Sequence, residues 1–396
     1  MLLALTGAFA LSQAFRTIAA ILATPLQAEF GLSAQQLGLF AGAFHFAFGA
    51  LQFFMGMGID VYGVRRTVLF AFPLVVAGAL LSAASTHFPV LVLGQVLIGV
   101  GCAPAFLVCT VFIARHFPPE RFASISGLVM GLASVGLLAT GTPLAWLVHE
   151  SSWRAGFIAL ALCSVLAWVA IARVVYEPPL PALGPAPSVM DALRSYGALF
   201  RLPHTLGIIA LASVTYAAFI SLRGLWLGPM LIERHGFTLV QSGNIALILS
   251  LIGMFGPPLF GRFDPGPGTR RRWIIGFTLA TAALFAAMAP KHGSGFDVGA
   301  SIAVSALSSY IIFQYADVKG AYPAAMTGRA MALFTMAMFL GVAVMQWLTG
   351  AVASAAVAHG INAFTAVFAT IAGLLLLGAA AFAWLPAPPA APARPR

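Results

Sequence analysis

The strongest constraint on the fold of this chain is an internal repeat with a constant offset of 205 positions, as between Gly31 and Gly236. Residues of the same or similar chemistry recur at that offset through much of the first half. The other matched pairs are Ser33 and Thr238, Gln36 and Gln241, Gly38 and Gly243, Gly56 and Gly261, Gly63 and Gly268, Arg65 and Arg270, Arg66 and Arg271, and Phe117-Pro118 and Tyr322-Pro323. Because chance rarely keeps one spacing over so many residues, we predict two halves of the same architecture.

Long apolar runs fill both halves. Hydrophobic residues make up 61% of the chain, charged residues make up 8%, and the mean hydropathy is +0.99, which excludes a soluble domain. A helix of about 20 apolar residues crosses the ~30 Å hydrocarbon core of a bilayer. Runs of that kind cover 3–24, 34–58, 67–85, 88–114, 123–148 and 154–174, then 204–231, 239–260, 273–290, 297–316, 329–351 and 362–385. We therefore predict an all-α membrane protein with 12 transmembrane helices in two pseudo-symmetric six-helix halves.

Proline-rich sequence occurs in two places, between the two halves and in the tail after Leu385. Proline cannot continue a helix, so the YEPPLPALGPAP segment that begins at Tyr176 is predicted to be a linker. The predicted domains are an N-terminal six-helix bundle at 1–175, a cytoplasmic linker at 176–203, a C-terminal six-helix bundle at 204–385 and a cytoplasmic tail at 386–396.

The basic residues predict the orientation in the membrane. Of the 20 lysines and arginines, 15 lie in one set of loops and the tail, and only Arg154, Arg234 and Lys291 lie in the other set. Lys and Arg are retained on the cytoplasmic side during insertion, so both termini are expected in the cytoplasm. The net charge of +10 is then explained by the orientation of the chain in the membrane, and no nucleic-acid partner is expected. The three cysteines fall inside predicted helices, where they indicate neither a disulfide framework nor a metal site, and no cofactor is expected.

The loop after the second run carries a recognisable motif. It contains Gly56, Asp60 and Gly63, followed by the basic pair Arg65 and Arg66. This order resembles the loop signature of the major facilitator superfamily, a family of secondary transporters. Glycines permit a tight turn and close helix approach, and an aspartate beside arginines can form a breakable cytoplasmic latch. The second half repeats the pattern, with its acid one position out of register, and adds Asp264, Arg270 and Arg271 to the predicted latch.

Further segments extend the resemblance along the chain. Trp153 and Arg154 resemble the pair that opens the sixth helix in this superfamily, and the run from Gln95 to Gly101 resembles its fourth-helix motif with glutamine in place of arginine. Glycines 131, 136 and 141 with Pro143 are similar to the fifth-helix motif of its antiporter branch, although such spacing also suits simple close packing. The resemblance implies a bacterial inner-membrane carrier that works by alternating access, with helices 1, 4, 7 and 10 around a central cavity.

Two arginines, Arg16 and Arg223, lie within apolar runs. A guanidinium near the bilayer centre costs about 2.5 to 3.5 kcal/mol and does not release its proton. No acidic residue lies in the middle of a predicted span, so the countercharge is expected from the substrate. The resemblance adds that some superfamily members hold organic phosphates or other anions between arginines of the first and seventh helices. We predict an arginine clamp for a carboxylate or phosphate. The structural alternative is that each arginine pairs with helix-end carbonyls, reaches outward or meets a tyrosine ring.

Other polar residues on the same four helices complete the predicted substrate site. Polar atoms in hydrocarbon need protein or water as partners, so these helices should face a wet interior. The predicted substrate-binding residues are Arg16, Arg223, Gln13, Gln95, Tyr216, Tyr310 and Gln314.

The sequence leaves several alternatives for the coupling ion and for the class of solute. His45, in the middle of the second run, is the one central titratable candidate for proton coupling, although a lone histidine is more often a packing residue. The favoured function is secondary transport of a small organic anion, alone, with a proton or against a counter-anion, by a monomer. The alternatives are a proton-coupled drug or metabolite efflux antiporter, a copper or other metal importer that uses methionines such as Met55 and Met57, and a transport-inactive sensor. No nucleophile elbow, phosphate loop or paired carboxylate motif indicates an enzyme.

Overall fold

The computed structural model describes residues 1–176 and 196–388, without the side chains of residues 53, 56, 57, 60, 61, 119, 120, 122, 123, 324 and 325. The described residues form helices and no strand, which confirms the all-α class. The first half consists of α1 (Leu2–Thr17), α2 (Ala19–Phe30), α3 (Ala34–Ala83), α4 (Phe88–Cys102), α5 (Ala105–His116), α6 (Pro119–Ala133), α7 (Val135–Ala139), α8 (Thr142–Glu150) and α9 (Trp153–Val174). The second half consists of α11 (Thr205–Ser221), η1 (Leu222–Trp226), α12 (Leu227–Pro229), η2 (Met230–Arg234), α13 (Leu239–Arg262), α14 (Pro267–Met288), α15 (Ser294–Ser308), α16 (Ile311–Ala321), α17 (Ala324–Ala358) and α18 (Ala363–Trp384).

Most predicted spans correspond to helices or broken helices of the expected length. Within the described ranges, nine are long and apolar enough to cross a membrane, or ten if the bent pair α1 and α2 is one span. The predicted spans 34–58 and 273–290 are helical, as parts of α3 and α14, but do not belong to that set. The count of 12 therefore stays a prediction. The domain boundaries stay predictions as well, because 177–195 of the proposed linker and the tail from 389 lie outside the described residues.

The sequence repeat has a physical counterpart in matched helix starts. Gly31 and Gly236 both adopt left-handed φ values, +63° and +70°. Ser33 and Thr238 then form capping boxes, in which each hydroxyl accepts from a backbone N–H three residues on and a glutamine side chain accepts from the cap backbone in return. Both halves thus begin their second long helix with the same turn.

The repeat shifts by two residues at the next loop. Gly63 has φ 81° and ψ 168° inside α3, a break that ends one helical segment and begins the next. The residue with the same conformation in the second half is Gly266, at φ 79° and ψ 169°, and not Gly268, which the constant offset selects. Because a positive φ suits only glycine, the turn moves to the nearest glycine whose following proline can begin α14.

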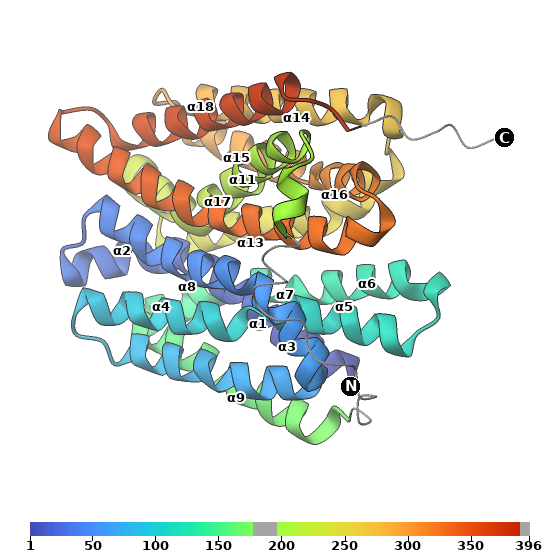
Figure 1. Cartoon of the computed structure of the whole chain (residues 1–396). Coiled ribbons are helices and arrows are strands. Elements are labelled where there is room, and N and C mark those ends of the chain that lie inside the picture. The colour runs from blue at the N-terminus through green and yellow to red at the C-terminus, as the bar shows by residue number, and fades with distance from the viewer. Residues whose placement is uncertain (177–195, 389–396) are drawn as a thin grey trace.

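The two halves form two stacked bundles, coloured blue to green and green to red in Figure 1. They meet along two seams, where α3 lies against α17 and α8 lies against α13. Gly38 abuts the backbone of Gln346 and Gly350 on one seam, and Gly243 abuts Gly141 and Ala145 on the other. The contacted residues are themselves 205 positions apart, so one interface is built twice. A Cβ at either glycine would collide with backbone or a short side chain, which makes both seams close helix crossings.

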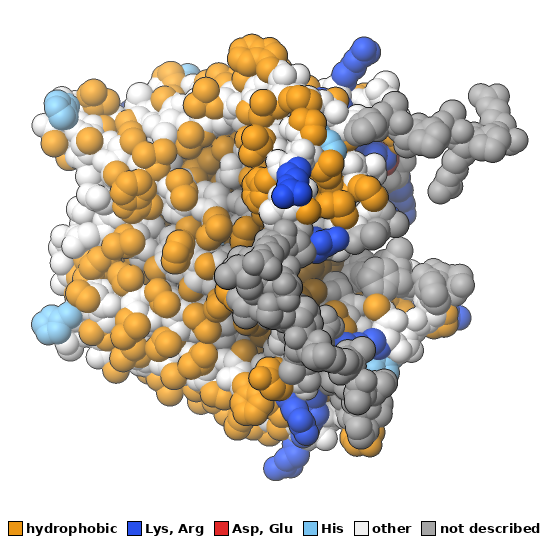
Figure 2. Space-filling view, viewed as in Figure 1, with side chains coloured by type: hydrophobic (Ala, Val, Ile, Leu, Met, Phe, Trp, Pro, Cys, Tyr) orange, Lys and Arg blue, Asp and Glu red, His pale blue; other side chains and the backbone are white. Residues whose placement is uncertain are grey.

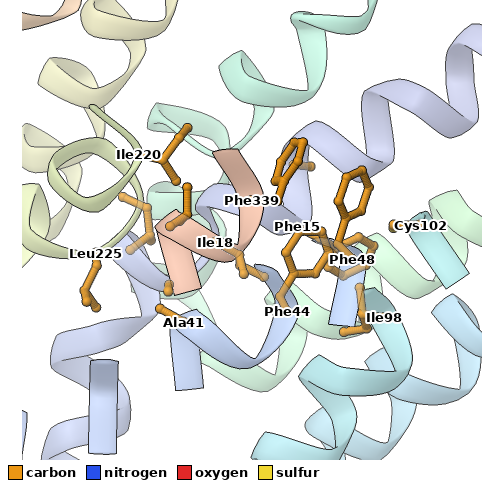
Figure 3. Close-up of a cluster of buried hydrophobic side chains, with 14 of the residues drawn as sticks. Phe15, Ile18, Ala41, Phe44, Phe48, Ile98, Cys102, Ile220, Leu225 and Phe339 are labelled. Atoms are coloured by element: carbon orange, nitrogen blue, oxygen red, sulfur yellow. The ribbon is translucent and has the colours of Figure 1, made fainter. Parts of the chain in front are cut away.

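The core continues across these seams. Figure 3 shows Ile220, Leu225 and Phe339 of the second half in one buried cluster with Phe15 and Phe48 of the first. A second, smaller cluster belongs to the C-terminal half and includes Tyr310 and Phe313. The bundles are therefore held together by apolar packing near their middle.

The bundles meet at one end of the molecule and diverge at the other. We call the end that carries Arg65, Arg271 and their neighbouring loops the basic end; Figure 2 shows Lys and Arg side chains gathered there. The seam contacts Gly38 to Gln346 and Gln35 to Ser354 lie toward the opposite end. In Figure 1 the ribbons of the two bundles lie farther apart toward the basic end, where the N-terminus lies.

Candidate functional site

Arg16, in the last turn of α1, lies where the two halves meet. Its guanidinium carbon is 4.6 Å from the ring centres of both Phe48 and Phe339. These two rings come from different halves, are 4.4 Å apart and are tilted by 52°, so the cation sits in a notch between them. Such contacts stabilise a cation by about 0.5 to 2 kcal/mol, and their ring faces replace water on one side of it.

The polar partners of Arg16 come from its own helix. Its NH1 donates to Gln13 Oε1 at 2.7 Å, and its NH2 donates to Ser12 Oγ at 3.3 Å. Its Nε has no hydrogen-bond partner, and none of the ion pairs in the described part of the chain involves Arg16. The residue is only 6% exposed. This cation is therefore buried with neutral partners and with spare donors.

Two tyrosines lie near the guanidinium. The ring of Tyr216 on α11 meets Phe339 edge-on at 5.5 Å. Tyr315 on α16 is close enough to both Tyr216 and Arg16 to interact electrostatically. The residues directly before the two tyrosines, Thr215 and Gln314, are joined by a hydrogen bond. Thr215 Oγ1 donates to Gln314 Oε1 at 3.1 Å. The structure thus brings Gln13 and, through Phe339, Tyr216 of the predicted set to the neighbourhood of Arg16, whereas Gln314 is bound to Thr215, one position before Tyr216.

His45 lies on the opposite-end side of this notch. Its Nδ1 donates to the carbonyl of Ala41 at 3.1 Å, and its ring stacks on Phe339 at 6.4 Å. Its Nε2 has no partner among the described residues, and neither does either amide atom of the neighbouring Gln346. Since both residues are at most 1% exposed, they are sealed from solvent in this conformation. Proton coupling through His45 stays a prediction.

Arg223 has a different environment. It is fully buried in the π-helical turn η1, where its Nε donates to Ser250 Oγ at 3.1 Å and its NH2 donates to the carbonyl of Leu137 at 3.1 Å. Leu137 belongs to α7 in the other half. Its carbonyl is free of a helical partner because the chain breaks at Gly141, whose N–H bonds to Leu138 instead. Arg223 thus caps a helix-break carbonyl, which is the structural alternative that the sequence left open.

The two arginines are close in backbone but not in side chain. A Cβ at Gly224 would lie 3.1 Å from the carbonyl oxygen of Arg16, so their helices cross at this point. The side chains then take separate partners on α3 and α17 for Arg16, and on α7 and α13 for Arg223. No described interaction joins the two guanidinium groups in this conformation.

No contact among the described residues joins Gln95 or Tyr310 to Arg16. Gln95 is buried in α4 and its Nε2 has no partner among the described residues. Tyr310 exchanges a 2.9 Å hydrogen bond with Thr278 and stacks on Phe277, inside the second core cluster. The described contacts place Tyr310 in the packing of the C-terminal half.

At the basic end, the predicted latch residues form contacts within each half. Arg270 holds Asp264 with two hydrogen bonds of 2.9 and 2.6 Å, which lower the pKa of that carboxyl. Arg271 donates to the carbonyls of Phe382 and Leu385 at the end of α18, and its guanidinium carbon is 4.1 Å from the Phe382 ring centre.

The first-half latch is only partly described. Arg65 donates to the carbonyl of Ala172 at 2.9 Å. The surroundings of Gly56 and the side chain of Asp60 are not among the described parts of the chain, so their part of the latch stays a prediction.

Sequence reasoning missed Phe48, Phe339 and Gln346. Phenylalanines are common in apolar helices, so nothing in the pattern distinguishes the two that contact Arg16. Gln346 had a usable signal, because an amide in the middle of an apolar run needs a partner and its position repeats that of Gly141. No group of three His, Cys, Asp or Glu side chains that could hold a metal ion occurs within 1–176 and 196–388.

Comparisons with known proteins agree on one family. The family model described as Major Facilitator Superfamily matches residues 4–316. The chain is 24% identical to the hexuronate transporter of Bacillus subtilis over 249 residues, which span 61% of this chain and 58% of that one. It is 27% identical to the D-galactonate transporter of Escherichia coli over 46% of this chain and 42% of that one. It is 29% identical to an MFS-type efflux pump of Mycolicibacterium smegmatis over 69% of this chain and 63% of that one. Each match spans less than two thirds of the relative's length.

A solved structure extends the agreement to nearly the whole chain. The crystal structure of a D-xylose-proton symporter superposes with a TM-score of 0.73 at 14% identity, and the match covers 98% of both chains. At that identity the likeness concerns the fold alone.

Proposed function

The chain belongs to the Major Facilitator Superfamily, and from that membership we propose that it is a secondary transporter for a small organic anion. Its relatives are transport proteins, and the chain is therefore a carrier and not an enzyme. We place it in the inner membrane of a bacterium, where it exposes one central site alternately to each side.

The observation that carries the anion assignment is Arg16. A buried guanidinium is expensive in a bilayer, and in the described residues its partners are two rings, an amide and a hydroxyl, none of them charged. Its unpartnered Nε and the remaining N–H groups suit a carboxylate, which accepts two parallel hydrogen bonds from such a fork. The anion then supplies the missing countercharge at the moment of binding.

The neighbouring groups favour a hydroxylated carboxylate. Tyr216, Tyr315 and Gln13 offer hydroxyl and amide groups that can donate and accept. The names of two relatives, a hexuronate and a D-galactonate transporter, describe sugar acids with this combination of one carboxylate and several hydroxyls. We propose Arg16, Gln13, Tyr216 and Gln314 as the substrate residues of this conformation. Gln95 and Tyr310 remain predicted members of the site.

In the proposed transport cycle, Arg223 becomes available to substrate when the two halves move apart. Its NH2 is bound to Leu137 of the other half, and its NH1 has no partner among the described residues. If the bundles separate at the opposite end, that bond breaks and the guanidinium becomes available. Arg223 would then bind substrate only in that second conformation.

The arrangement of the bundles supports an inward-facing state. Positive loops predict that the basic end is cytoplasmic, and the described close contacts of the α3–α17 seam lie toward the other end. We propose that both termini are cytoplasmic and that the latch residues on the basic end form and break their contacts as the carrier switches.

The second candidate is an efflux antiporter, favoured by the likeness to the MFS-type efflux pump. Such a carrier would exchange a drug or metabolite for protons, with His45 as the titratable group. A metal importer and a transport-inactive sensor remain as outcomes that the experiment below separates.

The test is a thermal-shift screen of the purified protein with D-glucuronate, D-galactonate, glycerol phosphate, tetraphenylphosphonium and copper(I). Binding to the folded state raises the melting temperature by mass action. We expect stabilisation by the sugar acids in the wild type and in Arg262→Ala, an exposed arginine at the end of α13, and none in Arg16→Ala. Stabilisation by tetraphenylphosphonium or copper in all three proteins would contradict the anion assignment, and no stabilisation by any solute followed by no uptake into proteoliposomes would favour the sensor.

A further inference from the structure

A small cavity lies near the basic end of the C-terminal half, away from Arg16. Its volume is about 10 Å³, which is at the lower limit for holding one water molecule. Its walls are apolar side chains, among them Ile208, Phe334 and Phe382, except for two polar residues of α16, Gln314 and Asp317. These two are three positions apart, so they project from the same face of the helix.

Gln314 carries an unpaired donor beside this cavity. The residue is 3% exposed; its Oε1 accepts from Thr215, whereas its Nε2 has no hydrogen-bond partner among the described residues. Leaving a buried donor unpaired costs about 1 to 3 kcal/mol. A water molecule in the cavity could accept from Nε2 and donate to the Asp317 carboxylate, which removes that cost.

The charges around Asp317 come from several elements. Arg270 and Arg271 of α14 both interact electrostatically with the carboxylate, and Tyr322 after α16 is a further neighbour. His204, before α11, contacts the Tyr322 ring at 5.0 Å and has its pKa lowered by burial. Lys319 follows on the same helix, and the cavity walls from α17 and α18 are the apolar Phe334 and Phe382. Arg271 is also bound to the end of α18, so it has only part of its donor capacity left for Asp317.

The cavity is connected to the proposed substrate site by two adjacent pairs of residues. Thr215, the partner of Gln314, directly precedes Tyr216, and Gln314 directly precedes Tyr315. Tyr315 interacts electrostatically with Arg16, and Tyr216 contacts Phe339, whose ring packs on Arg16. A change in the orientation of the Gln314 amide is therefore one residue away from Tyr315, and one hydrogen bond and one residue away from Tyr216.

We infer that Asp317 is a proton-binding site, connected through one water molecule, Gln314 and Thr215 to the site that holds the anion. As a carboxylate, Asp317 accepts from the water, which accepts from Gln314 Nε2. When Asp317 takes up a proton from the basic-end solution, its hydroxyl donates to the water, and the water donates in turn to Gln314 Oε1, so the Gln314 amide rotates and Oε1 no longer accepts from Thr215. One bound proton offsets one bound carboxylate. The coupling role rests on the proposed function; the proton site does not.

The proton site is tested by infrared titration of the full protein in nanodiscs. The carbonyl band of a protonated carboxyl should appear as the pH falls in the wild type and in Glu150→Gln, a matched control that removes an exposed carboxyl at the end of α8. That component should be missing in Asp317→Asn and return, shifted, in Asp317→Glu. It should also shift in Thr215→Val, which removes the partner of Gln314, and persist in His204→Gln. A titration that is unchanged in Asp317→Asn overturns the inference.

The coupling role is tested by uptake of D-glucuronate into proteoliposomes. With an inward pH gradient, Asp317→Asn should lose accumulation by about tenfold or more, while exchange of internal for external D-glucuronate continues. Full gradient-driven accumulation by Asp317→Asn overturns the coupling role. If the wild type neither binds nor transports D-glucuronate, the proposed substrate class has failed, and the infrared result still decides whether Asp317 binds a proton.

Discussion

The two buried arginines occupy similar depths in the first helices of the two halves, yet they are held in different ways. Arg16 rests on two phenylalanine rings and donates to side chains of its own helix. Arg223 donates to a backbone carbonyl of the other half and to a serine that bonds to its own helix. Side chains can rotate to admit a ligand, whereas a backbone carbonyl at a helix break is fixed. The difference indicates that Arg16 is poised for substrate and that Arg223 ties the closed seam.

The local backbone explains why the environments differ. The repeat places Ser221 opposite Arg16 and Ile18 opposite Arg223, so the arginines are not equivalent positions. Arg223 also sits in a π-helical turn, which widens the helix and redirects its side chain toward α7 and α13. We therefore propose that, in this conformation, Arg16 is the binding cation and Arg223 is the fastening cation.

Among the variants that test this difference between the two arginines, Arg16→Lys should have the largest effect on substrate affinity. Lysine keeps the charge but loses the planar fork that grips a carboxylate, and its compact ammonium fits the notch between Phe48 and Phe339 less well. We expect the affinity for D-glucuronate to fall by about tenfold or more. Isothermal calorimetry measures it, with the melting temperature of the unliganded variant as the control for folding. Unchanged affinity would mean that Arg16 contributes charge alone.

A change at Arg223 should act on conformation and leave the intrinsic affinity in place. Arg223→Gln loses the hydrogen bond to Leu137, and bonds from charged groups contribute about 1.5 to 3 kcal/mol. The opposite end should then open more often, which raises the rate of thiol labelling at Ser354→Cys, in a background without the native cysteines, by about tenfold. His359→Cys, exposed at the same end, controls for reagent access.

A second variant protects that experiment against simple misfolding. Arg223→Lys keeps a cation that can reach one of the two partners, so its labelling rate should lie between those of the wild type and Arg223→Gln. Equal labelling of Ser354→Cys in all three backgrounds would show that Arg223 does not hold the seam.

The sequence predicted the fold and only part of the site, for physical reasons. Helix spans, the repeat and the caps follow from local rules, because Gly31 and Ser33 specify their turn without help from distant residues. The environment of Arg223 depends on Leu137, and the availability of that carbonyl depends on a helix break at Gly141. No local pattern encodes such a contact. The constant offset selected the wrong glycine for the turn before α14 for a similar reason. Either Gly266 or Gly268 could make that turn, and the structure uses Gly266.

A smaller effect is expected at Gln346, which lies beside Gly224 and next to His45. Its two amide atoms are buried beside His45 without a hydrogen bond of ordinary geometry to any described residue, and an unpaired buried amide atom costs about 1 to 3 kcal/mol. Gln346→Leu removes both polar atoms and keeps a similar size, so the sealed conformation should gain stability. We expect the melting temperature to rise by about 2 to 4 °C and the labelling of Ser354→Cys to slow. A lower melting temperature would instead show that this amide is satisfied by a group such as a buried water molecule.

The smallest and sharpest comparison is between the two serines that serve the arginines. Ser12→Ala removes an acceptor of Arg16 at 3.3 Å, whereas Ser250→Ala removes the acceptor of Arg223 Nε at 3.1 Å. Arg223 retains its bond to Leu137 in the second variant, so the loss should be about 1 kcal/mol, or roughly fivefold in the labelling rate of Ser354→Cys. Ser12→Ala should leave that rate unchanged and alter only the affinity for D-glucuronate, by a few-fold at most, because Gln13 still positions the guanidinium. If both serines changed the labelling rate equally, the two arginines would share one role, and the division between a binding cation and a fastening cation would be wrong.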